Sequence, residues 1–210
     1  MNGVALAEHD GARLTECLQR GGVAVFPADT VYGLGCDPAN EAAVRRLYEL
    51  KGRPAEHPAA VMFFDRALAL AALDELSESE RRAIQALLPG PVTLLLPNPG
   101  HRFPLAGGPT DGRASLGLRV PLLAYAVAAL RTVSVPMMQS SANLSGGAEA
   151  RRLTDVPQRL LEGADLVLDA GELPGVASTV VDLRDYARTG DWAVVREGAM
   201  ALDAVERALS

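Results

Sequence analysis

Two cations in the segment Lys51-Gly52-Arg53-Pro54 could bind a polyphosphate. Lys51 is the only lysine among 20 Lys and Arg residues, and its ammonium is a compact charge on a flexible stem, unlike the planar fork of Arg. A lysine at the end of a helix can also simply complement the helix dipole. That structural role does not explain Arg53, which precedes a proline and is therefore biased toward extended backbone. Two cations projecting from one loop are suited to phosphate oxygens.

The polar pair Asp29 and Thr30 precedes a glycine-containing segment at 32–35. We interpret 32–35 as a loop whose glycines let the backbone approach a ligand, with Thr30 as a hydrogen-bonding group. An ordinary glycine turn is the structural alternative. The segment matches neither GxGxxG nor a Walker A loop, so the sequence gives no support for standard dinucleotide or P-loop binding.

Hydroxyl, amide and guanidinium groups also occur where other strand-like runs begin or end. Such strand ends form the edge at which α/β sheets bind ligands. Each group has a structural alternative, because a Ser/Asn turn can satisfy its own backbone and a surface Arg usually forms an ion pair. The residues are Ser140, Ser141, Asn143, Ser178, Arg119 and Arg196.

The elements that must position these groups alternate between helical and extended patterns. We expect helices at 6–20, 40–50, 66–73, 77–88, 121–130, 154–162 and 202–209. We expect strands at 23–27, 59–64, 92–96, 115–120, 133–138, 165–169, 179–183 and 192–196. Asn40 is an expected N-cap, and Ser77 with Glu80 has capping-box spacing. This alternation predicts one α/β domain over 1–210 with a mixed parallel and antiparallel sheet.

Composition narrows the classes of function. The 210 residues are 49% hydrophobic, enough for one sizeable core. A net charge of -6 argues against a broad surface that binds nucleic-acid phosphates. Only 4% of the residues are aromatic, which argues against a surface on which bases stack. Neither the two cysteines nor the three histidines have metal-ligand spacing. With no signal-peptide pattern and no unbroken apolar span, we expect a cytoplasmic protein that does not enter a membrane.

Taken together and in order, seven segments closely resemble the YrdC-like family. The resemblance covers roughly residues 10–200, and the segments are 26–35, 51–54, 89–93, 118–121, 141–146, 178–180 and 196–198. It implies a single-domain twisted mixed sheet with flanking helices around a concave basic cavity. It also implies the short form, without the additional C-terminal domain of longer relatives.

The best-known activity of that family is L-threonylcarbamoyladenylate synthesis, a nucleotidyl transfer. The resemblance implies that L-threonine, bicarbonate and ATP give threonylcarbamoyl-AMP and pyrophosphate. The product would serve the N6-threonylcarbamoyl modification of tRNA, with tRNA and the transfer proteins as partners. Such a reaction requires positioning and charge neutralisation more than a protein nucleophile.

The resemblance also implies residue roles. Lys51 and Arg53 would be the catalytic cations that neutralise the triphosphate and the departing pyrophosphate. The remaining nucleotide and phosphate contacts would be Ser115, Ser141, Asn143 and Arg196. The threonine contacts would be Thr30, Arg119 and Ser178. Mg²⁺ would be held through the ATP phosphates, with no metal site of the protein's own and no permanently bound cofactor.

The chain also departs from the family pattern in places. Residues that differ from those common in relatives are Ala28, His57, Ala59, Met62 and Ser140, and the segment 148–152 lacks the usual prolines. These changes leave open a paralogue with another carbamoyl or acyl adenylate as substrate. A double-stranded RNA or tRNA-binding module without turnover is a second alternative, which the acidic net charge disfavours.

Overall fold

A mixed sheet of ten strands organises residues 5–54, 59–106, 108–110 and 113–210, which the computed structural model describes. The strand order is β10-β9-β4-β6-β3-β7-β2-β1-β8, and β5 pairs with β6 off this path. The pairs β1–β8, β3–β6 and β4–β9 are parallel, and the other pairs are antiparallel. The mixed sheet expected from the sequence is therefore confirmed.

The strands are β1 (Val23–Pro27), β2 (Tyr32–Cys36), β3 (Ala60–Met62), β4 (Val92–Pro97), β5 (Gly108–Thr110), β6 (Arg113–Arg119), β7 (Met137–Ser141), β8 (Leu166–Val167), β9 (Thr179–Asp182) and β10 (Ala193–Arg196). The α-helices are α1 (Asp10–Gln19), α2 (Glu41–Lys51), α3 (Arg66–Ala72), α4 (Glu78–Leu87), α5 (Gln158–Gly163), α6 (Tyr186–Thr189) and α7 (Leu202–Leu209). Two 3₁₀ segments, η1 (Tyr125–Thr132) and η2 (Leu153–Asp155), complete the set. No helix of the described ranges is long and apolar enough to cross a membrane.

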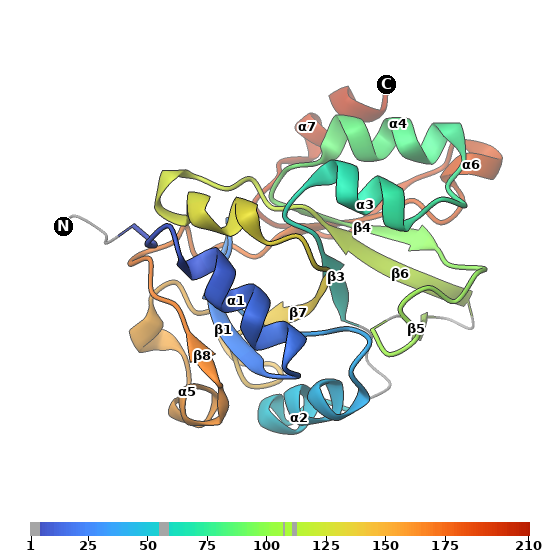
Figure 1. Cartoon of the computed structure of the whole chain (residues 1–210). Coiled ribbons are helices and arrows are strands. Elements are labelled where there is room, and N and C mark those ends of the chain that lie inside the picture. The colour runs from blue at the N-terminus through green and yellow to red at the C-terminus, as the bar shows by residue number, and fades with distance from the viewer. Residues whose placement is uncertain (1–4, 55–58, 107, 111–112) are drawn as a thin grey trace.

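The helices cover the sheet in separate groups. Figure 1 shows α3, α4, α6 and α7 gathered at one end of the molecule, α2 and α5 at the other, and α1 lying over β1. Alternation along β4 and β6 directs Leu94, Leu96, Leu116 and Leu118 into the larger core. The opposite face of β1, β3 and β7 packs against α1 and η1 in a second core.

Local capping signals in the sequence are confirmed. The Asn40 side chain accepts a hydrogen bond from Ala43 N at 3.0 Å, which fixes the start of α2. Gly52 ends the same helix with a left-handed φ of 60°, a conformation that glycine adopts without a Cβ penalty. Ser77 and Glu80 form the expected reciprocal capping box at the start of α4.

The expected glycine loop at 32–35 is wrong, because these residues lie in the buried strand β2. Gly33 pairs with Phe26 and Gly35 with Ala24 in the hairpin with β1. A Cβ on Gly33 would lie 2.7 Å from the Phe26 ring, and one on Gly35 would lie 2.4 Å from Met137 Sδ. The glycines thus make room for neighbouring core side chains rather than for a ligand.

Three other expected elements are displaced by prolines or by a competing hydrogen bond. The strand expected at 133–138 begins after Pro136, which has no N–H for the ladder, and it extends through Ser141. The helix expected from 121 starts only at Tyr125, as a 3₁₀ turn, since Leu122 N donates to Asp29 Oδ2. The helix expected at 154–162 begins at Gln158, because Val156 before Pro157 is extended.

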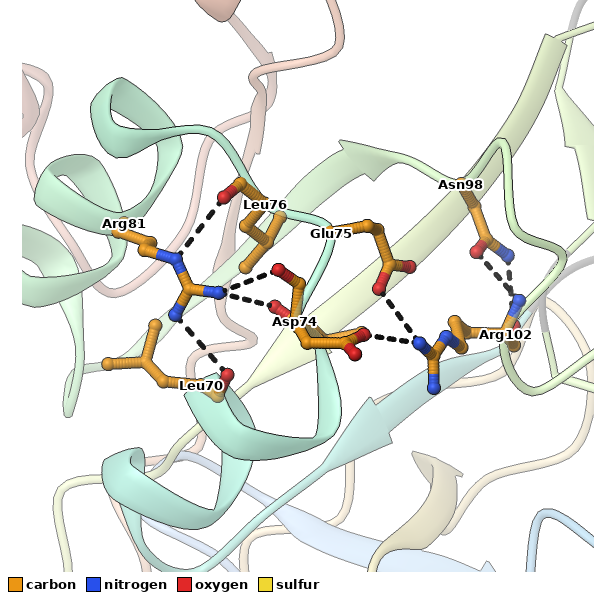
Figure 2. Close-up of polar contacts among 8 residues, drawn as sticks. Leu70, Asp74, Glu75, Leu76, Arg81, Asn98 and Arg102 are labelled. Carbon is orange, nitrogen blue, oxygen red and sulfur yellow. Dashed lines mark hydrogen bonds and ion pairs between the residues drawn. The ribbon is translucent and has the colours of Figure 1, made fainter.

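Figure 2 shows two arginines at the α3–α4 connection, of which Arg102 joins this connection to the segment after β4. The Arg81 guanidinium donates to four backbone carbonyls, those of Leu70, Leu73, Asp74 and Leu76. Arg102 pairs with the Asp74 and Glu75 carboxylates, and its backbone exchanges two hydrogen bonds with the Asn98 side chain. Backbone groups outside regular structure are satisfied in this way, which ties the α3–α4 connection to the segment after β4.

Candidate active site

A cavity of about 210 Å³ lies over the middle of the sheet. Its walls come from one face, since residues two apart along β4, β6 and β7 point the same way. On β6 these are Ser115, Gly117 and Arg119. Seven of the residues expected from the sequence line this single cavity: Thr30, Arg53, Ser115, Arg119, Ser141, Ser178 and Arg196.

A register shift in β10 places Arg196 on the cavity side. Val194 pairs with Val181 on β9, but Arg196 rather than Val195 pairs with Val180. Val180 lines the cavity, and directly opposed residues of an antiparallel pair point to the same face. The bulge therefore directs the Arg196 guanidinium toward the cavity, a common use of bulges at binding sites.

Lys51 and Asn143 do not line the cavity but lie behind Ser141, which does. Lys51 is 2% exposed. Its Nζ donates to the Ser141 carbonyl and, at 2.8 Å, to Asn143 Oδ1. Ser141 Oγ also donates to Asn143 Oδ1 at 2.8 Å, and Asn143 Nδ2 donates to Gly147 O at 2.6 Å. The lysine thus anchors the end of β7 and the loop that follows it.

Burial makes the Lys51 ammonium unusually acidic. Loss of solvent around Nζ and, to a smaller extent, the nearby Arg53 charge together lower the pKa of Lys51 to about 8, although the Glu149 charge opposes this change. Arg53 itself lines the cavity, and its Nη1 donates to Ser140 Oγ at 3.0 Å. Both cations of the 51–54 segment are therefore tied to β7.

Arg119 lies at the end of β6 in a buried ion pair. Its Nη2 is 2.6 Å from Asp29 Oδ1, and both side chains are 4% exposed. The same Nη2 lies 3.5 Å from Thr30 Oγ1. Burial lowers the pKa of Arg119, and the Asp29 charge opposes that change. Asp29 thereby fixes the guanidinium beside Thr30.

Ser178 connects two walls of the cavity. Its Oγ lies 2.9 Å from Thr93 Oγ1, a buried hydroxyl pair. Arg196 Nη2 donates to the Ser178 carbonyl at 2.7 Å and to Ser178 Oγ at 3.2 Å. The Arg196 side chain is thus oriented by the backbone it crosses.

The positions that depart from the family pattern are spread over several environments. Ala59 and Ser140 line the cavity, whereas Ala28 and Met62 are packed in the core beside α1. His57 lies outside the described residues. Among the described residues, the departures that face a bound ligand are therefore Ala59, Ser140 and, in the 148–152 segment, Glu149.

Sequence reasoning missed three polar residues of the cavity wall, Thr93, Gln139 and Glu149. Thr93 ends the 89–93 segment of the family resemblance but was given no role there, and Gln139 lies inside β7 without a local motif. Glu149 lies in the segment noted for its missing prolines, so its position was visible although its role was not.

The donor set offers little for a metal ion held by the protein alone. Within the described ranges, no group of three or more His, Cys, Asp or Glu side chains could hold one. The Ser141 hydroxyl lines the cavity and is an oxygen ligand of the kind that Mg²⁺ on substrate phosphates prefers, whereas Asn143 Oδ1 already accepts hydrogen bonds from Lys51 and Ser141.

Comparison with known proteins gives consistent matches over nearly the whole chain. The Sua5_yciO_yrdC family profile, described as "Telomere recombination", matches residues 16–198. The Threonylcarbamoyl-AMP synthase of Aliivibrio fischeri is 32% identical over 188 residues, which are 89% of this chain and 97% of the relative. The protein of the same name from Pyrococcus abyssi is 30% identical over 91% of this chain, which spans only 55% of that longer relative.

Two solved structures have the same fold. The P. abyssi Sua5 complexed with L-threonine superposes with a TM-score of 0.82 at 27% identity, covering 97% of this chain and 58% of that one. E. coli YciO superposes with a TM-score of 0.75 at 26% identity, covering 97% of this chain and 96% of that one.

Proposed function

The chain belongs to the Sua5/YciO/YrdC family, and on that premise we propose that it is a threonylcarbamoyl-AMP synthase. Its substrates are L-threonine, bicarbonate and ATP, and its products are threonylcarbamoyl-AMP and pyrophosphate. The observation that supports this function best is the convergence of Thr30, Arg119 and Ser178 with Arg53, Ser141 and Arg196 in one cavity. The first three residues suit an amino acid, and the other three suit a nucleotide.

The amino-acid end of the cavity is built around Arg119. Its guanidinium is held by Asp29 within reach of the Thr30 hydroxyl. A planar fork matches a carboxylate with two parallel hydrogen bonds, so Arg119 binds the threonine carboxylate. The Thr30 and Ser178 hydroxyls contact the rest of the amino acid.

The nucleotide end of the cavity is formed by β6, β7, β10 and the loop after α2. Arg53 and Arg196 supply fixed positive charge, and Ser115 and Ser141 supply hydroxyls. Lys51 and Asn143 hold the Ser141 backbone and hydroxyl in position. Phosphate charge bound in the cavity favours the protonated form of the Lys51 ammonium, which stays behind Ser141.

The reaction then depends on how the cavity positions the bound threonine, carbon dioxide and ATP. The threonine ammonium gives up one proton, and bicarbonate takes up a proton and loses water to give carbon dioxide. The free amine then bonds to the carbon of carbon dioxide and loses a second proton, giving a carbamate. A carbamate oxygen bonds to the α-phosphorus as the bond from that phosphorus to the bridging oxygen breaks, and pyrophosphate leaves with the electron pair. Arg53, which lines the cavity, neutralises the charge that develops on this leaving group, and the Lys51 ammonium behind Ser141 adds to the positive potential there. Mg²⁺, bound with ATP, supplies further charge neutralisation on the phosphates.

We place the product in the N6-threonylcarbamoyl modification of tRNA, where a mixed carbamic–phosphoric anhydride is consumed by an amine nucleophile. This assignment follows the family and the product's chemistry. Direct binding of tRNA is a separate matter that the activity does not require.

The test is pyrophosphate release with ATP, bicarbonate and each amino acid in turn. We expect release with L-threonine that stops when bicarbonate is omitted, together with threonylcarbamoyl-AMP identified by mass spectrometry. Release with a different amino acid would identify a paralogue with another substrate. No release, combined with RNA binding that weakens steeply with salt, would identify an RNA-binding module.

A further inference from the structure

One acidic side chain of the cavity wall, Glu149, has no role in the binding of threonine or ATP as described so far. Of the residues that the structure describes, Glu149 is the carboxylate that lines the cavity, together with Arg53, Arg119 and Arg196. In the same described ranges, its Oε2 atom is buried without a hydrogen-bond partner. Buried polar atoms are nearly always paired in proteins, so an exception beside a cavity indicates a missing ligand.

The backbone holds Glu149 in this position from both sides. Asn143 Nδ2 donates to Gly147 O at 2.6 Å, and Tyr32 N donates to Ala150 O at 2.9 Å. Tyr32 belongs to β2, two residues after Thr30, so this second contact brings Glu149 to the amino-acid end of the cavity. The carboxylate is therefore built into the site rather than carried on a free loop.

A second unpaired atom lies on the facing group. Arg119 Nε is also buried with no hydrogen-bond partner among the described residues. Glu149 raises the pKa of both Arg119 and Lys51, so its charge acts on both. One wall thus offers an unsatisfied cationic donor, and another offers an unsatisfied anionic acceptor. An amino acid complements this pair of groups, because its α-carboxylate and its α-ammonium are both attached to the same carbon.

A metal ion is a poorer fit for this carboxylate. Within the described ranges, Glu149 belongs to no group of three or more His, Cys, Asp or Glu side chains that could hold a metal ion. Asp29, the other acidic group near Arg119, already accepts hydrogen bonds from Arg119 and from Leu122 N. An ammonium needs fewer ligands than Mg²⁺ and donates hydrogen bonds to single acceptors.

We propose that Glu149 binds the α-ammonium of the amino-acid substrate while Arg119 holds its carboxylate. The proposal rests on the threonylcarbamoyl-AMP synthase function and adds to it a residue that selects for an α-amino acid. Glu149 orients the nitrogen that must later bond to carbon dioxide. Its carboxylate also discriminates against acids of the same shape that lack the amino group.

The experiment compares binding of L-threonine and of 3-hydroxybutanoate, which retains the carboxylate, hydroxyl and methyl but lacks the amino group. Binding is measured by calorimetry without ATP or Mg²⁺ in the wild type, in Glu149→Gln and in Glu206→Gln. Glu206 is an exposed residue of α7, so its variant controls for the change in net charge. ATP binding by each variant shows that the fold is intact.

In Glu149→Gln we expect threonine affinity to fall by about tenfold or more, as for loss of a hydrogen bond between charged groups. Affinity for 3-hydroxybutanoate is expected to stay the same or improve, and Glu206→Gln should match the wild type for both ligands. Equal threonine affinity in Glu149→Gln and wild type would overturn the proposal and leave the synthase function standing. A wild type that binds no L-threonine would overturn the synthase function and, with it, this proposal.

Discussion

Asp29 and Arg119 are joined by a 2.6 Å hydrogen bond between two side chains that are each 4% exposed. The second Asp29 oxygen accepts a hydrogen bond from Leu122 N at 3.1 Å, so the carboxylate links β6 to the chain that follows it. Removing two charges from water is costly, and the pair is stable only while both partners are present. Arg119 can hold a substrate carboxylate because Asp29 already fixes its orientation.

We expect Asp29→Asn to lower the free energy of unfolding by about 3–5 kcal/mol, since it leaves the Arg119 charge without its buried partner. Chemical denaturation measures this change. The KM for L-threonine should rise as the guanidinium loses its fixed orientation. Asp203→Asn removes an exposed i,i+4 partner of Arg207 and should change stability far less. Equal effects of the two variants would contradict the structural role of Asp29.

Lys51 is surrounded by acceptors spaced for an ammonium. We expect Lys51→Arg to lose most pyrophosphate release although it keeps the charge, because a guanidinium cannot replace Nζ between Ser141 O and Asn143 Oδ1. Lys51→Met should lose turnover as well and be destabilised by about 1–3 kcal/mol through the unpaired acceptors. Arg45→Met, on the exposed side of α2, is the matched control. Near-normal turnover in Lys51→Arg would argue against a specific role for the ammonium.

The acidity of Lys51 predicts opposite effects of pH on activity and stability. The folded-state pKa is about 8, below the ordinary value of 10.5, so the unfolded chain binds more protons between these two values. The contribution of Lys51 to the free energy of unfolding therefore increases as pH rises from about 8 to 10.5. Over the same range the ammonium is lost, so kcat/KM for ATP should fall. The measurement is the difference between wild type and Lys51→Met in both quantities, and a difference that does not vary with pH would refute the assignment.

Gly33 lies against the ring of Phe26 inside the sheet. We expect Gly33→Ala to destabilise the protein by about 1–3 kcal/mol, since the new methyl overpacks the core. Phe26→Leu should make room for it, so the effect of Gly33→Ala should be smaller in that background. Thermal unfolding of the two single variants and the double variant checks this. Additive effects would show that the two positions are not in contact.

Features set by neighbouring residues could be predicted from the sequence. The Asn40 cap, the Ser77 capping box and the helix end at Gly52 each depend on a few adjacent residues, and all three are found in the structure. The mixed sheet also follows from the alternation of helical and extended patterns. The caps can be predicted because each is formed by hydrogen bonds between residues only a few positions apart in the sequence.

Features set by distant residues could not be predicted in the same way. The glycines of β2 look like a loop until Phe26 and Met137 are seen to occupy the space above them. The pairing of Asp29 with Arg119 joins residues 90 positions apart. Convergence of Thr30, Arg53 and Arg196 in one cavity was expected only through the family resemblance, since no spacing in the sequence implies it. Glu149 lies in a segment that the sequence marked only by its missing prolines, so its place in the cavity wall required the fold.

The two ends of the open sheet have a consequence for the protein in concentrated solution. One edge strand, β8, has two residues, and the other, β10, is interrupted by the register shift before Arg196. A long, flat edge would offer unpaired N–H and C=O groups as a template for another chain. Here β8 is very short, and β10 has a bulge and carries the charge of Arg196, so neither edge strand forms such a template. The same irregularity that turns Arg196 toward the cavity thus also protects the sheet from edge-to-edge aggregation.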